Sequence, residues 1–386
     1  MAYNPQLIRY TTSMPTRLVD LYFQPEFVKN LGRRIEMVHP EFRPQMFQNL
    51  VYTHDWESLE LKARMRQISV ALGQSLPSYY PQAIDILLEV ERYFDGFDHM
   101  VFADFVEVHG LADFETSIKA LGVFTRSSAE FAIRPFLIKY PKQTLTQLYV
   151  WSQSTNEHHR RLASEGCRPR LPWAMGVPFL KHKPDLIIPI LENLKTDSSE
   201  YVRRSVANNL NDISKDHPEV VLEVAKRWLQ EKPETEKLLR HALRGLLKKG
   251  DTQALSLFGY AKVEDVSVTN LVISSPERSR RDEKPLSTRH PETLAPHPKQ
   301  KKRHPELVSG STLPIQVPLN STATLSFTLT NNSKNPQTLR LEYEIGFLTK
   351  KGGESVKVFQ LGEQMLAAGE SRQFARKLNL PTKPPE

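Results

Sequence analysis

Cysteine is almost absent from this sequence of 386 residues, and so are long apolar runs. The single cysteine, Cys167, cannot form a disulfide within the chain and offers no spacing for a cysteine-based zinc site, which is typical of a reducing cytoplasm. No apolar run approaches the ~20 residues that cross a bilayer. The first residues also lack the basic start and apolar middle of a secretory signal. We therefore expect a soluble cytoplasmic protein that has no membrane partner.

Acidic residues are in the minority, because 52 Lys and Arg residues face 44 Asp and Glu residues and give a net charge of +8. This balance favours an anionic partner, and nucleic acid is the commonest one. The segment 276–312 holds nine Lys or Arg residues against five acids, so half of the excess charge falls in what reads as a linker. The charge by itself is therefore weak evidence.

Helical spacing of apolar residues runs from about Gln6 to Tyr260, with short Pro, Gly or Asp breaks. Residues 151–163 align with residues 194–206 at a spacing of 43, and a third copy at 238–243 follows 37 residues later. Periods near 40 made of paired helices are typical of HEAT-type solenoids, in which each pair buries its face against its neighbours. The sequence predicts a HEAT-like α-α solenoid over residues 1–260.

After Lys262 the pattern changes to the alternation of apolar and polar residues that half-buried strands show. Several short strands at this spacing predict a small all-β immunoglobulin-like sandwich over residues 263–386. The segment 276–312 interrupts the sandwich with six prolines and few apolar residues, so we expect a disordered insertion and assign it no function. The strands are expected at residues 263–274, 323–330, 339–345, 356–361 and 373–378.

Acidic groups placed among arginines make residues 125–218 the richest source of candidate site residues. If the repeats stack side by side, these residues line one concave surface that carries both cations and carboxylates. The pattern consists of pairs or rows at a spacing of four residues: Glu130 with Arg134, Arg161 with Glu165, and Arg204 with Asn208 and Asp212.

Such a surface suits cleavage of a glycosidic bond in DNA. Arginines would pair with phosphates and position the duplex. Carboxylates would repel the phosphates, but they stabilise the positive charge of an oxocarbenium-like sugar and can orient the attacking water. A base that is already cationic through N-alkylation departs as a neutral species, so no general acid is required. An aromatic face beside the sugar adds roughly 0.5–2 kcal/mol, and Trp173 is the candidate.

Each of these features also has a purely structural interpretation. A Glu–Arg pair at this spacing is commonly a solvated salt bridge worth roughly 0.2–0.5 kcal/mol. Trp173 can be a packing residue, and the doublets 160–161 and 203–204 suit the polar face of HEAT helices. The adjacent histidines 158–159 would point to different helix faces, so we expect them in a loop or first helical turn and assign no metal site. Spacing alone leaves open a noncatalytic HEAT-repeat scaffold and a groove-binding enzyme.

Three segments, residues 128–136, 159–173 and 201–218, closely resemble the AlkC family of DNA alkylation-repair glycosylases, within the AlkC/AlkD superfamily. The C-terminal sandwich resembles the Ig-like domain of one subgroup. The resemblance implies a DNA N-glycosylase of base excision repair, which releases 3-methylcytosine and 3-methyladenine from duplex DNA by hydrolysis of the N-glycosidic bond. It also implies that the reaction needs no metal or other cofactor and no deep base flipping. We expect a monomer that acts on alkylated duplex DNA in the bacterial nucleoid.

Carried over by position, the resemblance makes Glu130 and Glu165 the carboxylates at the sugar, Asp212 the residue nearest the water, and Trp173 the aromatic wall. The insertion 276–312 departs from the subgroup, so a DNA-binding relative that has lost turnover is a third hypothesis. The residues expected to contact DNA are Arg161, Arg168 and Arg204, together with Arg134, Arg160, Arg203 and Asn208.

Overall fold

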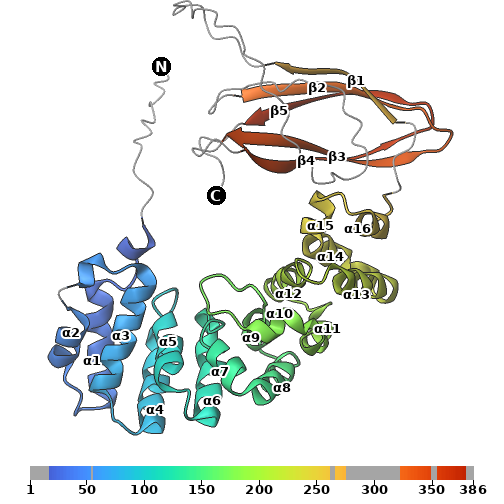
Figure 1. Cartoon of the computed structure of the whole chain (residues 1–386). Helices are drawn as coiled ribbons and strands as arrows, with labels where there is room; N and C mark the ends of the chain where they lie inside the picture. The colour runs from blue at the N-terminus through green and yellow to red at the C-terminus, as the bar shows by residue number, and fades with distance from the viewer. Residues whose placement is uncertain (1–16, 54, 261–265, 275–321, 349–353, 380–386) are drawn as a thin grey trace, which may run out of the picture. The chain divides into compact units, whose positions relative to one another are not determined.

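The computed structural model describes residues 17–260 except 54, and then 266–274, 322–348 and 354–379. The chain divides into two compact units, Met1–Gly245 and Leu246–Glu386 (Figure 1). The insertion expected at 276–312 lies outside the described residues.

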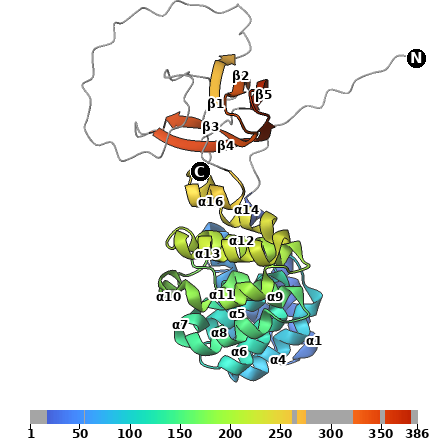
Figure 2. The ribbon, with the colours of Figure 1, turned by 90° about the vertical axis from the view of Figure 1, so that its right-hand side faces the viewer.

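The first unit is built from helices that pack against their neighbours along the chain, which confirms the helical-repeat prediction. Figure 2 looks along this succession, so that helices of successive repeats overlap. No helix among the described residues is both long and apolar enough to span a bilayer. The helices of this unit are α1 Pro25–Val38, α2 Pro44–Val51, α3 Leu61–Ser75, α4 Tyr80–Val90, α5 Met100–His109, α6 Phe114–Phe124, α7 Arg134–Lys139, α8 Pro141–Trp151, α9 Glu157–Gly166, α10 Pro178–His182, α11 Ile188–Leu194, α12 Glu200–Ile213, α13 Pro218–Glu231 and α14 Glu236–Ala242. Helix α15 Arg244–Lys248 crosses the boundary at Gly245, and α16 Thr252–Leu257 belongs to the second unit.

Helices α9 and α12 show how the sequence repeat becomes structure. They begin at Glu157 and Glu200, the spacing of 43 that the sequence alignment gave, and they pack against each other. The Asn156 side chain caps α9 by accepting a hydrogen bond from the main-chain N–H of His158 at 2.9 Å. The two histidines therefore lie in the first helical turn, as predicted. Leu162 and Val206 are fully buried between neighbouring helices.

Aromatic side chains fill much of the core in the first half of this unit. Phe23, Phe47, Phe102, Phe124 and Phe136 are all fully buried. Burying one such side chain stabilises the fold by roughly 1.5–3 kcal/mol. This part of the solenoid therefore has the apolar packing that a rigid support needs.

The strands of the second unit form two antiparallel sheets, one with the order β1-β2-β5 and the other pairing β3 with β4. Along β2, every second residue from Ala323 to Leu329 is buried. Three of these residues, Leu325, Phe327 and Leu329, form one core with Leu339, Leu366 and Leu378. This arrangement confirms the predicted small β-sandwich. The strands are β1 Val266–Ser274, β2 Thr322–Asn331, β3 Gln337–Leu348, β4 Glu354–Leu366 and β5 Ser371–Asn379.

Candidate active site

Three carboxylates from three successive parts of the solenoid belong to one ion-pair network. Glu130 lies in the turn before α7, Glu165 in the last turn of α9, and Asp212 in the last turn of α12. Only 5%, 6% and 2% of these residues, respectively, is exposed. The fold thus brings together the three carboxylates that the sequence singled out.

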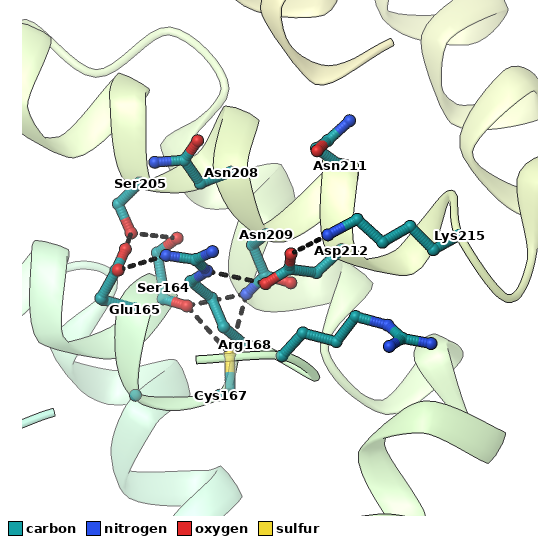
Figure 3. Close-up of polar contacts among 12 residues, drawn as sticks. Ser164, Glu165, Cys167, Arg168, Ser205, Asn208, Asn209, Asn211, Asp212 and Lys215 are labelled. Atoms are coloured by element: carbon teal, nitrogen blue, oxygen red, sulfur yellow. Dashed lines mark hydrogen bonds and ion pairs between the residues drawn. The ribbon is translucent and has the colours of Figure 1, made fainter. Parts of the chain in front are cut away.

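Arg168 joins two of these carboxylates. Its Nη1 lies 2.6 Å from Glu165 Oε1, and its Nε lies 2.9 Å from Asp212 Oδ2. Figure 3 shows the guanidinium between the two acids, with Lys215 Nζ on the far side of Asp212 at 3.2 Å. Burial by itself lowers the pKa of Arg168, but the two carboxylates outweigh burial and the pKa is raised. Arg168 is therefore a permanent cation between the two acids.

Arg161 extends the network to the third carboxylate. It forms an ion pair with Glu130, and its Nη2 lies 3.9 Å from Glu165 Oε1. The ring centroid of Tyr201, on α12, lies 4.6 Å from the Arg161 guanidinium carbon and adds a cation–π contact. The interpretation of Arg161 and Glu165 as a solvated salt bridge is wrong, because both side chains are largely buried.

Ser205 holds the second oxygen of Glu165, and no pattern in the sequence had singled out this serine. Its Oγ donates a hydrogen bond to Glu165 Oε2 at 2.6 Å and lies 3.0 Å from Ser164 Oγ (Figure 3). Asn209 donates from Nδ2 to the Ser164 carbonyl at 2.7 Å, which ties α12 to α9 beside the carboxylate. The aligned position in the preceding repeat is Leu162, so the repeat pattern contains no signal for a hydroxyl here.

Arg134 occupies a different place from the one the sequence suggested. It is fully buried, and its Nη1 donates to the main-chain carbonyls of Gly166 at 3.1 Å and Arg168 at 2.9 Å. Burial lowers the pKa of Arg134 to about 10. It does not pair with Glu130, because Glu130 lies in a turn and α7 begins only at Arg134. Its burial leaves no route to a phosphate, so the expected DNA contact does not fit the structure.

Each arginine doublet contains one member, Arg160 or Arg203, that contacts its own repeat. Arg160 donates from Nη1 to the carbonyls of residues 154–155, and Arg203 donates from Nη1 to those of residues 197–198. Arg160 also forms a two-pronged ion pair with Asp197, at 2.6 and 3.1 Å. The same contact recurs one repeat later, so Arg160 and Arg203 close the loop of their own repeat. The structural interpretation, not the expected DNA contact, fits both residues.

Arg204, Asn208 and Trp173 are the predicted residues that face outward or lie near the surface. The Arg204 side chain is 65% exposed, and Glu200 lies 3.6 Å away. Asn208 Oδ1 accepts a hydrogen bond from Arg244 Nη2 at 3.1 Å, which adds a cation that the sequence reasoning missed. Trp173 is 66% exposed, so its interpretation as a packing residue is wrong.

A pocket of about 320 Å³ lies beside the first half of α12 and contains none of the three carboxylates. Its basic lining residues include Arg203, Arg204, Lys237 and His241. Among the described residues, no group of three or more His, Cys, Asp or Glu side chains is arranged to hold a metal ion.

Comparison with known proteins identifies the family. A family model described as DNA alkylation repair enzyme matches residues 125–246, which hold the whole ion-pair network. The solved structure of the Pseudomonas fluorescens alkylpurine DNA glycosylase AlkC, bound to DNA that contains an abasic site analog, is 34% identical to this chain with a TM-score of 0.80. That match covers 95% of this chain and 91% of the AlkC chain. This chain belongs to the AlkC family.

Two further matches include the C-terminal unit. A family model described as the C-terminal Ig-like domain of the uncharacterised protein YhaZ matches residues 307–382. The uncharacterized protein YhaZ of Bacillus subtilis is 38% identical over 355 residues, which are 92% of this chain and 88% of YhaZ. The chain therefore combines the helical repeat fold of AlkC with an Ig-like domain.

Proposed function

We propose that this member of the AlkC family is a DNA N-glycosylase of base excision repair. It hydrolyses the N-glycosidic bond of cationic N-alkylated bases, 3-methylcytosine and 3-methyladenine among them, in duplex DNA. The observation that carries the proposal is the network in which Glu130, Glu165 and Asp212 are buried together with Arg161 and Arg168. The AlkC structure bound to DNA with an abasic site analog supports DNA as the partner.

A noncatalytic scaffold has no use for this network. Taking a carboxylate or a guanidinium out of water costs several kcal/mol per ion, and a well-packed apolar cluster would join the same helices at a lower cost. Glu165, Arg168 and Asp212 nevertheless lie between α9 and α12, where apolar packing would suffice. A set of buried charges in fixed positions is what stabilisation of a charged transition state requires.

Cleavage of the N-glycosidic bond has two parts, the departure of the base and the attack of water on the sugar. The electron pair of the C1′–N bond leaves with the cationic base, which becomes neutral, and the sugar becomes an oxocarbenium ion. Glu130 and Glu165 stabilise that positive charge, and Asp212 accepts a proton from the water that attacks C1′. No general acid is needed, so the base can leave without entering a deep pocket.

Phosphates of the bound DNA complete the charge balance. The network without DNA pairs its carboxylates with Arg161 and Arg168. A guanidinium has five N–H donors, so Arg161 and Arg168 can each bind a phosphate oxygen while they hold the carboxylates in position. Arg204 is exposed and contributes a phosphate contact on the next repeat. Trp173 supplies the aromatic face beside the lesion.

Release of free methylated base from a duplex treated with a methylating agent tests the proposal. The wild-type protein and its Glu165→Gln variant are compared in the presence of EDTA, with Glu192→Gln as the matched control. Glu192 also accepts from an arginine and from Trp228 Nε1, at 2.8 Å for the latter, but it lies outside the network. We expect release by the wild type and the control and none by Glu165→Gln.

The other outcomes separate the competing functions. Duplex binding without release by the wild type would identify a DNA-binding relative that has lost turnover. Neither binding nor release would support the protein-binding scaffold. Equal release by the wild type and Glu165→Gln would show that Glu165 takes no part in the reaction.

A further inference from the structure

The loop between α9 and α10, residues 167–177, presents two apolar side chains to solvent. Trp173 and Met175 are both exposed. Trp173 has a φ of +60°, in the left-handed region that costs a non-glycine residue about 1–3 kcal/mol. Such a conformation persists only where the surroundings impose it. Contacts between the loop and the rest of the helical unit must therefore hold the Trp173 main chain in place.

Arg134 binds the loop at both of its ends. Its Nη1 donates to the Gly166 and Arg168 carbonyls where the loop begins, and its Nε donates to the Met175 carbonyl where the loop ends. These acceptors are main-chain oxygens, so the buried guanidinium gains no carboxylate in return for its lost hydration. The side chain of Arg168 holds Glu165 and Asp212 while its carbonyl accepts from Arg134, which links the loop directly to the carboxylates.

Lys62 holds the middle of the loop. It is an exposed residue of α3, and its Nζ donates to the Trp173 carbonyl at 2.7 Å across 111 residues of sequence. The same Nζ lies 5.6 Å from the ring centroid of Phe131, the neighbour of Glu130 in sequence. Lys62 therefore contacts the strained residue itself and the segment that carries one of the carboxylates.

We propose that Arg134 and Lys62 are positioning residues that hold the main chain of residues 167–177 so that the Trp173 indole meets the DNA in one fixed orientation. The inference rests on the proposed glycosylase function, because Trp173 is there the aromatic face at the lesion. It assigns to Arg134 and Lys62 an action through Trp173 and not through phosphates.

The fluorescence of Trp173 tests the positioning without requiring activity. The protein has four tryptophans, and the other three, Trp56, Trp151 and Trp228, are buried. A soluble quencher therefore removes the emission of Trp173 selectively. The difference between the anisotropy decays recorded without and with the quencher reports how freely this indole moves. We expect Lys62→Met to increase this local motion and Lys62→Arg, which keeps a donor, to restore most of the restriction.

Lys139 provides a matched control for Lys62. It is an exposed lysine whose Nζ donates to the Leu111 carbonyl at 3.1 Å and lies 5.1 Å from the ring centroid of Tyr140. Lys139→Met removes the same kind of contact elsewhere, and we expect it to leave the anisotropy decay of Trp173 unchanged. Arg134→Lys, which keeps the charge but shortens the reach, should act like Lys62→Met.

A double-mutant cycle with Trp173→Ala connects the motion to the reaction. We expect Lys62→Met to lower the single-turnover rate of base release about tenfold, since a misplacement of about 1 Å can cost about 100-fold. In the Trp173→Ala background the same change should alter the rate by less than about twofold, because residues that act through one another are not additive. A purely structural role would lower the rate of base release by the same factor in both backgrounds and would also shift the melting temperature.

The two measurements fail separately. Unchanged indole motion in both Lys62→Met and Arg134→Lys would overturn the positioning role, whatever the activity. Additive rate losses in the cycle would also overturn it, because the effect would then bypass Trp173. Absence of base release by the wild type would overturn the proposed glycosylase function, and the fluorescence comparison would still decide whether these residues hold the loop.

Discussion

Ser205 on α12 donates a hydrogen bond of 2.6 Å to Glu165 on α9, so the orientation of one candidate catalytic carboxylate is set by the neighbouring repeat. Arg168 holds the other oxygen of the same carboxylate at 2.6 Å. Both oxygens of Glu165 therefore have a charged or hydroxyl partner, and small changes around them should affect the reaction more than the stability of the fold.

Replacing Ser205 by Ala should lower the rate of base release about threefold to tenfold, because one hydrogen bond of roughly 1 kcal/mol that orients Glu165 is lost. Single-turnover release and thermal unfolding are measured together. Ser69→Ala is the control, since Ser69 is equally buried but donates to a main-chain carbonyl in α3. A rate equal to that of the wild type would show that Ser205 does not orient Glu165.

Asp212→Asn should lower the rate of base release by about 100-fold or more, because a residue that accepts the proton of the water contributes about 10²–10⁴. The variant should still bind the duplex, since the amide keeps an acceptor for Arg168. Asp197→Asn is the control, because Asp197 forms a buried ion pair with Arg160. This control variant should lose stability but keep the wild-type rate of base release. Equal rates in the two variants would contradict the role of Asp212.

Arg203→Met should reduce the stability of the fold, whereas Arg204→Met should reduce the salt dependence of DNA binding. Arg203 donates to carbonyls of its own loop, so its loss should reduce the free energy of unfolding by about 1–3 kcal/mol. Arg204 is exposed, so its loss should leave stability unchanged and reduce the slope of log affinity against log salt by about 1. Titrations of duplex DNA at several salt concentrations measure this slope. A lower slope of log affinity against log salt for Arg203→Met would show that Arg203 contacts DNA.

The stability of the helical unit should fall in mild acid because of His99. Burial lowers the pKa of His99 below the ordinary value of 6.5, although Glu91, 2.8 Å away, opposes the shift. The unfolded chain therefore takes up a proton that the folded protein refuses, and the free energy of unfolding decreases as the pH falls below about 6.5. It stops decreasing, as far as His99 is concerned, once the folded pKa is passed.

Thermal unfolding between pH 8 and pH 5 measures this effect, and His99→Gln should flatten the curve. His182→Gln is the control, because His182 is exposed. Arg126 also contacts Glu91, at 2.9 Å, so the variant keeps an ion pair at this carboxylate. A curve with the same slope in His99→Gln and in the wild type would show that another group causes the acid sensitivity.

Some expectations from the sequence failed because spacing does not report where a helix begins. Glu130 and Arg134 have the separation of a helical pair, but α7 begins at Arg134, and the two side chains enter different networks. Arg160 and Arg203 look like surface cations next to Arg161 and Arg204. Both donate to main-chain carbonyls of their own loops, and no pattern of charges along the sequence reveals these contacts.

Patterns along the chain were enough to predict the two kinds of fold and to single out three candidate carboxylates. Helical periodicity, the repeat of 43 residues and the alternation after Lys262 depend on local geometry, and the family motifs contain Glu130, Glu165 and Asp212. Which side chains meet depends on the stacking of the repeats in three dimensions. Ser205 reaches Glu165, and Lys62 reaches the Trp173 carbonyl, across gaps of 40 and 111 residues. Such contacts depend on how repeats stack, because packing of neighbouring helices, not spacing along one helix, brings these atoms together.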